Sequence, residues 1–179
     1  MDPQHPVRRT VVRASAWTVP AVVVAVSAPA VAASTSPADL RFDTAIVFGG
    51  DYDQARPTQL VSHVQVQNSY YPGAPTVTSL VLTVSYPQSA VSGAAATLLA
   101  GAGWSYTSVV SSGAQWVYRF DWVGSAAPGA STGLLKYAVP ILMSPYPVGQ
   151  TVTLAFTATA SGGTAVASAS YTIPVRGGR

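Results

Sequence analysis

Two aspartates in a glycine-rich segment are the residues of this chain best suited to bind a metal ion. Asp51 and Asp53 are separated by one residue and follow Gly49 and Gly50, and Ca²⁺ takes carboxylate ligands from loops of this kind. The twelve-residue calcium-loop pattern is missing, because Gln54 comes next and no third acidic residue is near. We therefore expect a solvated loop without a bound metal or other cofactor, in which Asp51 and Asp53 are candidate ligand contacts.

The segment 116–122 has an aromatic residue at every second position and could serve as a platform for sugar rings. In an extended strand all four rings project from one face, and the two charged residues of the segment project from the other. A strand must bury one of its faces, and charges resist burial. We therefore expect the aromatic side to line the core, with a tryptophan at a strand end partly exposed. The four residues are Trp116, Tyr118, Phe120 and Trp122.

Groups that could carry catalysis are scarce. His63 is the only histidine beyond the first 33 residues, and it falls on the polar side of its predicted strand. The chain has no cysteine and no glutamate, and it contains neither a Gly-x-Ser-x-Gly elbow nor a Gly-Lys-Ser/Thr phosphate loop. We predict that the protein is not an enzyme and has no catalytic residues. The Asp51–Asp53 loop and the region of Trp104 should matter more for function than His63.

The composition indicates an all-β protein. Alanine, valine, serine and threonine make up just over half of the 179 residues, while only 8% are charged and 49% are hydrophobic. A soluble helical bundle needs Glu, Lys and Arg on its solvent-exposed faces, and this chain has too few of them. A disordered chain is too poor in apolar residues to form a core, whereas this chain has enough of them to bury one. The lack of cysteine excludes a disulfide-stapled scaffold. One β-rich domain remains.

Positive charge is concentrated at the N-terminus. The formal net charge of the chain is +3, but residues 33–179 carry six basic and five acidic residues, a net charge of +1. These basic residues are scattered, so we expect no nucleic-acid partner and no basic patch for a membrane surface. They are Arg41, Arg56, Arg119, Lys136, Arg176 and Arg179.

Residues 1–33 have the order of an export signal. A basic stretch with Arg8, Arg9 and Arg13 precedes an apolar run over 14–26 and a tail of small residues. Signal peptidase needs small residues at positions −3 and −1, and Ala30 and Ala32 supply them, so cleavage is expected at Ala32/Ala33, with Ala28-Pro29-Ala30 as a second option. Before cleavage, we expect a helix over part of 7–26.

The basic stretch resembles a twin-arginine (Tat) signal. Arg8 and Arg9 fill the paired positions, Val11 and Val12 the apolar ones, and Arg13 the following base, although the family favours phenylalanine at the place of Val11. Export by the general Sec route and retention of the run as an anchor are the alternatives. Two prolines and the lack of a following basic cluster favour cleavage. No later segment is long and apolar enough to span a bilayer, so we expect no membrane span after cleavage.

Period-two alternation beyond the leader predicts seven or eight strands. In the first, Leu40, Phe42, Ile46 and Phe48 should share the buried face. We expect one helical turn over 94–99, and Pro140 marks an edge strand or a strand end. The predicted strands cover 40–48, 59–68, 76–86, 104–110, 114–123, 135–141, 151–160 and 167–175. The predicted core contains Phe42, Val66, Leu82, Trp116, Phe120, Val139, Leu154, Phe156 and Tyr171.

The succession of short motifs resembles the immunoglobulin-like β-sandwich modules of bacterial secreted and surface proteins, of the conserved surface-repeat type. The motifs are a strand ending at Asn68, a strand running up to Pro87, Gly103-Trp104, the turn segment 126–131 and Val148-Gly149. The resemblance implies an immunoglobulin-like antiparallel sandwich over 40–175, after a linker over 34–39 and before a polar tail over 176–179. Modules of this family usually occur in arrays, whereas a single module is expected in this sequence.

The family's role implies an exported, non-enzymatic module with a structural, adhesion or binding role, secreted or associated with the cell surface. Its expected partner is an envelope or matrix protein or a glycan of unknown identity. The alternative is a small secreted carbohydrate-binding module that uses surface aromatic residues. Its candidate contacts are Tyr70, Tyr71, Trp104, Tyr106 or a terminal tryptophan of the aromatic segment 116–122.

Overall fold

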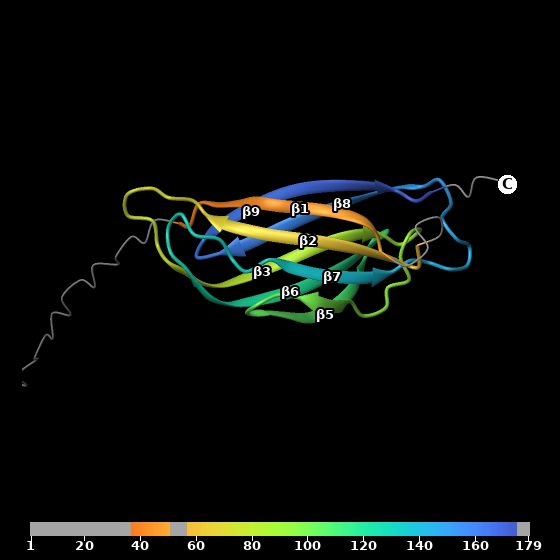
Figure 1. Ribbon diagram of the computed structural model, residues 1–179, viewed down its shortest axis with the longest axis horizontal. Coiled ribbons are helices and arrows are strands. Elements are labelled where there is room, and N and C mark those ends of the chain that lie inside the picture. Colours follow the sequence, from red (N-terminus) through yellow and green to blue (C-terminus); the bar gives the residue numbers. More distant parts are fainter. Residues whose placement is uncertain (1–36, 51–56, 175–179) are drawn as a thin grey trace, which may run out of the picture. The chain divides into compact units, whose positions relative to one another are not determined.

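The computed structural model describes residues 37–50 and 57–174, which belong to the second of the chain's two compact units, Ser34–Arg179. The regular secondary structure of the described residues consists of nine β-strands and no helix. The strands form two antiparallel sheets packed as a sandwich (Figure 1). Sheet A has the order β1-β2-β7-β4, and sheet B has the order β5-β6-β3-β8-β9. The strands are β1 (Leu40–Gly50), β2 (Gln59–Asn68), β3 (Val77–Pro87), β4 (Thr97–Ala100), β5 (Trp104–Ser112), β6 (Gln115–Ala126), β7 (Leu135–Pro140), β8 (Thr151–Ala160) and β9 (Gly163–Thr172).

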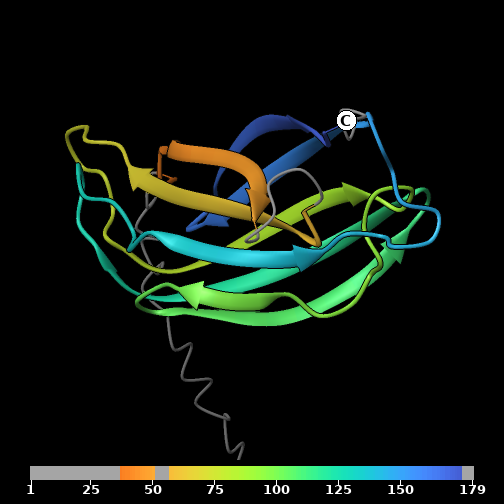
Figure 2. The ribbon, with the colours of Figure 1, turned by 45° about the vertical axis from the view of Figure 1, so that its right-hand side comes forward.

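The predicted all-β class and antiparallel sandwich are confirmed. Figure 2 shows the two sheets as separate layers, with β2 and β7 over β3 and β6. No helix in 37–50 or 57–174 has the length and hydropathy needed to cross a membrane. The predicted leader with Arg8, Arg9, Arg13, Ala30 and Ala32 lies outside the described residues, as do positions 34–36 of the linker and the tail 176–179.

Sheet B follows the predicted alternation closely. In β8, Val152, Leu154 and Phe156 are buried, and exposed residues alternate with them. β3 lies at the centre of the sheet. Its Leu82 pairs with Phe120 of β6 on one side and with Ala158 of β8 on the other. Because successive side chains of a strand point to opposite faces, such alternation buries one face and leaves the other to solvent.

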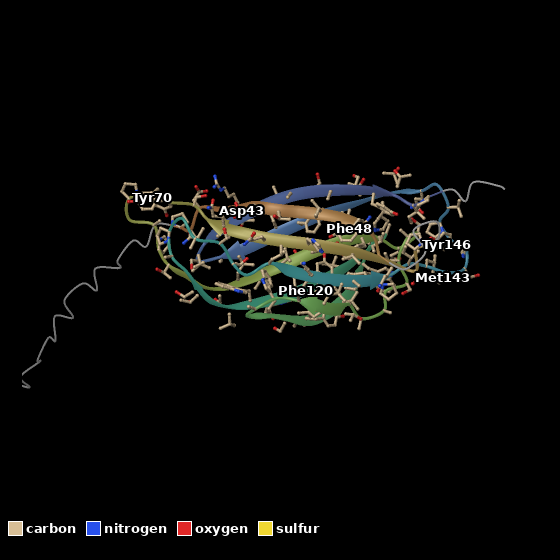
Figure 3. The ribbon with its side chains drawn as sticks, viewed as in Figure 1. Asp43, Phe48, Tyr70, Phe120, Met143 and Tyr146 are labelled. Carbon is tan, nitrogen blue, oxygen red and sulfur yellow. The ribbon has the colours of Figure 1, made fainter. Side chains whose placement is uncertain are left out.

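The aromatic side of β6 lines the core, as predicted. Tyr118, Phe120 and Trp122 are buried, and Trp116 at the start of the strand is partly buried. Arg119 on the opposite face is exposed, whereas Phe120, labelled in Figure 3, is fully buried. The charges beside the aromatic row therefore identified its buried side correctly.

A β-bulge interrupts β1, and the sequence pattern did not reveal it. Phe42 pairs with Val66 of β2, but the next pair joins Thr44 to Gln65, so Asp43 is an extra residue on β1. A single extra residue exchanges the two faces of the strand beyond it.

The predicted phase of the first strand is therefore wrong beyond Asp43. Before the bulge, Leu40 is buried and Phe42 packs against the core, as expected. After it, Val47 takes the core position, while Ile46 and Phe48 point outward and are 47% and 37% exposed. The bulge thus moves two large apolar side chains from the core to the surface.

The expected helical turn over 94–99 is also wrong. Residues Thr97–Ala100 form the short strand β4, which pairs with β7 through Thr97 opposite Ala138 and Leu98 opposite Tyr137. Pairing with β7 gives these backbone groups hydrogen-bond partners that an isolated helical turn, costly to nucleate, would not supply. Because β7 lies between β2 and β4, Pro140 marks a strand end and not an edge strand.

The core prediction holds for most positions. Phe42, Trp116 and Tyr171 are only partly buried but pack against the core. The remaining predicted residues are buried: Val66, Leu82, Phe120, Val139, Leu154 and Phe156.

Candidate functional surfaces

Trp104 and Tyr106, the candidate ligand contacts on β5, face the core. Trp104 is 7% exposed, and its indole Nε1–H donates to the carbonyl oxygen of Gly133 at 2.9 Å. The ring of Tyr106 packs edge-on against Phe120, with centroids 5.7 Å apart. Trp104 is thus largely covered, whereas Tyr106 is half-buried, and the role of both residues in binding stays a prediction.

The most exposed aromatic side chain among the described residues is Tyr70. It is 77% exposed in the loop between β2 and β3, whereas its neighbour Tyr71 is partly buried and donates its hydroxyl hydrogen to the carbonyl of Pro37. Figure 3 places Tyr70 at one end of the sandwich, well away from Phe48. A sugar-binding platform needs neighbouring coplanar rings, and the described residues do not supply one. Asp51 and Asp53 lie outside the described residues.

Three hydroxyl groups meet inside the sandwich. Tyr86 of β3 donates to the hydroxyl oxygen of Tyr137 on β7 at 3.1 Å, and its hydroxyl lies 2.9 Å from Oγ of Ser62 on β2. All three residues are fully buried. The cluster therefore links the two sheets through hydrogen bonds in a region without water contact, where an unpaired hydroxyl would be costly.

These buried tyrosines are unsuited to acid–base chemistry. Burial raises the pKa of Tyr86 well above its usual range, and the neighbouring Tyr137 raises it further. Burial likewise raises the pKa of Tyr137 and that of Tyr118, whose hydroxyl donates to the carbonyl of Ala94 at 2.9 Å. Because the ionised form of each is disfavoured, the hydroxyls stay neutral and act as hydrogen-bonding groups.

The outer face of sheet A carries a cluster of apolar side chains around the only histidine of the described residues. The register places Ile46 opposite His63 and Phe48 opposite Val61. The ring of Phe48 meets His63 edge-on, with centroids 5.0 Å apart, and Lys136 of β7 lies on the other side of His63. We call Ile46, Phe48 and His63 the sheet A patch. Figure 3 shows Phe48 on β1, toward the end of the strand.

The environment of His63 favours its neutral form. Partial burial lowers its pKa below the usual 6.5, and the positive charge of Lys136 lowers it further. A neutral imidazole adds little charge to the sheet A patch at neutral pH. No cluster of three or more potential metal ligands of the Asp, Glu, His or Cys type occurs in the described part of the chain.

The outer face of sheet B has a different character, with small hydroxyl side chains and paired charges. Arg119 Nη2 lies 3.0 Å from Oδ1 of Asp121, and Thr107 donates to Oδ2 of the same carboxylate at 2.7 Å. Hydroxyls of β8 and β9 also pair across the strands, as in Thr153 and Ser170 at 2.8 Å. This face offers neither a free charge nor a group poised for chemistry among these contacts.

The sheet A patch was missed because the sequence pattern assigned Ile46 and Phe48 to the core. One signal was present, since Asp43 and Thr44 are two consecutive polar residues and break the alternation of apolar and polar side chains. His63 was placed correctly on the outer side of β2, but its contact with Phe48 depends on the bulge and could not be read from either strand alone.

Comparisons with known proteins give neither a family nor a close relative. No protein-family model matches the chain, and no curated protein matches it. The surface-repeat assignment therefore stays a prediction.

Three solved structures are similar at low identity. BslA, described as a bacterial hydrophobin, has 14% identity and a TM-score of 0.45 over 80% of this chain and 100% of that chain. A DUF4466 family protein from Parabacteroides merdae has 15% identity and a TM-score of 0.41 over 77% of this chain and 46% of that one. A non-cellulosomal cohesin from the archaeon Archaeoglobus fulgidus has 14% identity and a TM-score of 0.41 over 75% of this chain and 91% of that chain. At these sequence identities and TM-scores, no functional property of the three proteins can be assigned to this chain.

Proposed function

We propose that this protein is an exported, non-enzymatic β-sandwich module that acts by binding a partner at the cell envelope or in the extracellular matrix. The observation that carries the proposal is the outward turn of Ile46 and Phe48 after the bulge at Asp43. β-Bulges often re-aim side chains next to functional sites. Exposing two large apolar residues side by side forfeits stability that their burial would provide, and clustered exposed apolar groups mark interaction sites.

The chemistry of the surface supports binding over catalysis. The buried tyrosine hydroxyls are held neutral and hydrogen-bonded, and the carboxylate of Asp121 is paired with Arg119. His63 contacts an aromatic ring and faces a lysine. A histidine that acts as a general base needs a hydrogen-bond acceptor that orients its ring and a nucleophile within reach. Because its neighbours are Phe48 and Lys136, His63 is better suited to contact a partner as part of the sheet A patch.

The carbohydrate-binding alternative receives less support. Tyr70 is strongly exposed, but a single ring without a coplanar neighbour gives weak stacking, and Trp104 is engaged with Gly133. An apolar protein surface fits the sheet A patch better than a sugar does, because Ile46 and Phe48 offer no hydrogen-bonding groups for hydroxyls.

The proposal is tested by titrating purified protein onto the envelope fraction of the producing cells and measuring the bound fraction by sedimentation. We expect saturable binding by the unaltered protein. The double variant Ile46→Ser/Phe48→Ser should bind at least about tenfold more weakly, since each large apolar side chain contributes roughly 1.5–3 kcal/mol when buried.

The matched control removes exposed apolar surface from sheet B instead. Val123 and Val166 are 70% and 76% exposed, and Val123→Ser/Val166→Ser should leave the affinity unchanged. Equal weakening by both double variants would contradict the assignment of binding to the sheet A patch, and the absence of saturable binding would contradict the proposed function.

A further inference from the structure

Four strands border the two sheets, and three of them are protected against pairing with another chain. β1 carries the bulge and the charged residues Arg41 and Asp43, and β4 has only four residues. β9 lies beside β1 of the other sheet (Figure 2). Bulges, charges, short length and coverage are the usual means by which sheet edges are kept from associating.

β5 is the edge strand without these protections in its second half. It has nine residues with no charge and no proline, and it ends sheet B, at the border of the sandwich opposite β9 (Figure 1). The hydroxyl of Tyr106 bonds to the backbone of Ala96 just before β4, so the first half of β5 lies close to sheet A. A bulge at Thr107 separates that half from Ser108–Ser112.

The segment Ser108–Ser112 is regular, and its last three residues, Val110–Ser112, are exposed. It pairs residue by residue with β6, from Ser108 opposite Arg119 to Ser112 opposite Gln115, and Val110 at its middle is 55% exposed. In the described part of the chain no strand pairs with its other side. Alternate backbone N–H and C=O groups of an edge strand point away from the sheet and are ready to pair with another strand.

We infer that β5 pairs with β5 of a second copy of this chain, antiparallel and about a two-fold axis at Val110. A two-fold contact requires a surface that complements itself. The segment Ser108–Ser112 meets this requirement. Val110 would lie opposite its own counterpart, Val109 opposite Ser111, and Ser108 opposite Ser112. Opposed hydroxyls and opposed β-branched side chains are favourable cross-strand pairs.

The neighbouring strand strengthens this choice of axis. Val110 lies opposite Val117 of β6, so the pairing would create a row of four valines across the two copies. Arg119 lies opposite Ser108 and is bound to Asp121, so no unpaired like charges would meet at the axis. The two five-stranded sheets would become one continuous sheet, which leaves the sheet A patch free; the inference therefore does not depend on the proposed function.

Cysteine substitution tests the pairing directly, because the chain has no cysteine of its own. Directly opposed residues of antiparallel strands have Cα atoms about 4.5–5.5 Å apart, within the range that a disulfide spans. Under mild oxidation with diamide, Val110→Cys should form a covalent dimer, whereas Val166→Cys, on the exposed side of β9, should stay monomeric. A mixture of Ser108→Cys and Ser112→Cys should cross-link faster than either variant alone.

A second experiment measures association without cross-linking. Sedimentation equilibrium should show a monomer–dimer equilibrium that Val110→Lys weakens at least about tenfold, since like charges placed directly opposite one another disfavour strand pairing. Val123→Lys, which adds the same charge at an exposed position of β6, should not change it. A monomer at all concentrations, or equal cross-linking through Cys at 110 and 166, would overturn the inference. Cross-linking of Ser108→Cys to itself would show parallel pairing and overturn it as well.

Discussion

At the scale of single residues, the hydroxyl of Tyr86 is a buried polar group that joins the two sheets. It lies between Ser62 and Tyr137, and its removal in Tyr86→Phe takes one hydrogen bond from each of these two buried hydroxyls. We expect a loss of about 1–3 kcal/mol in the free energy of unfolding, measured by urea denaturation. Tyr70→Phe removes a hydroxyl from an exposed side chain and should change stability by less than about 0.5 kcal/mol. Equal effects of the two variants would show that the buried cluster does not stabilise the sandwich.

His63 makes stability depend on pH in a defined direction. Its pKa in the folded protein is lowered by burial and by Lys136, so the unfolded chain binds a proton more readily than the folded one. The resulting stabilisation is fully present above the unfolded pKa near 6.5 and decreases as the pH falls through the lower, folded value. Thermal unfolding followed from neutral pH to about pH 5 should show a smaller decline in Tm for His63→Gln than for the unaltered protein. An identical decline would mean that His63 titrates alike in both states.

The positions of these residues were predicted more readily than their contacts. The predicted core residues Leu82 and Val139 share the period-two phase of Tyr86 and Tyr137, which are buried, and His63 lies on the outward side of its strand as predicted. The hydroxyl cluster joins β2, β3 and β7, and residues on three strands meet only after the packing of the sheets is known. Side-chain phase is a local property, whereas a hydrogen-bonded cluster depends on register.

At the scale of elements, the bulge in β1 decides which residues of that strand face the core. Val47 is 9% exposed, whereas Phe48 is 37% exposed. Val47→Asn should therefore lower the free energy of unfolding by at least about 3 kcal/mol, because it loses apolar burial and buries an amide. Phe48→Asn should cost about 1 kcal/mol or less. The reverse order in urea denaturation would show that the strand keeps the unbroken alternation of its sequence.

The same strand shows why the sequence could not define the whole sandwich. The spans of β2 and β8 matched their predicted ranges, because an unbroken period of two is present in each. An extra residue in β1 has meaning only relative to its partner β2, and β4 has too few residues to show any period. Short edge strands and bulges are settled by pairing with neighbours and not by their own composition.

At the scale of the whole molecule, the expected export route makes a testable claim about the leader. Arg8→Lys/Arg9→Lys keeps the positive charge but removes the arginine pair, so it should block secretion by a twin-arginine route while leaving a Sec route active. Immunoblotting of culture medium and cell extract measures the outcome, and N-terminal sequencing of secreted protein should give a start near Ala33. Secretion undiminished by the double substitution would identify Sec, and secreted protein beginning at Met1 would contradict cleavage.

The claim that the protein acts by binding through the sheet A patch is tested most directly by cross-linking in the producing cells. Phe48 is replaced by the photoreactive p-benzoylphenylalanine, which keeps an aromatic ring at the exposed position beside His63. A matched variant carries the same group at Val166, on the exposed side of β9. After irradiation, we expect a discrete covalent adduct of higher mass from position 48 and none from position 166. An adduct from position 166 alone, or from neither position, would contradict binding through this face of the sandwich.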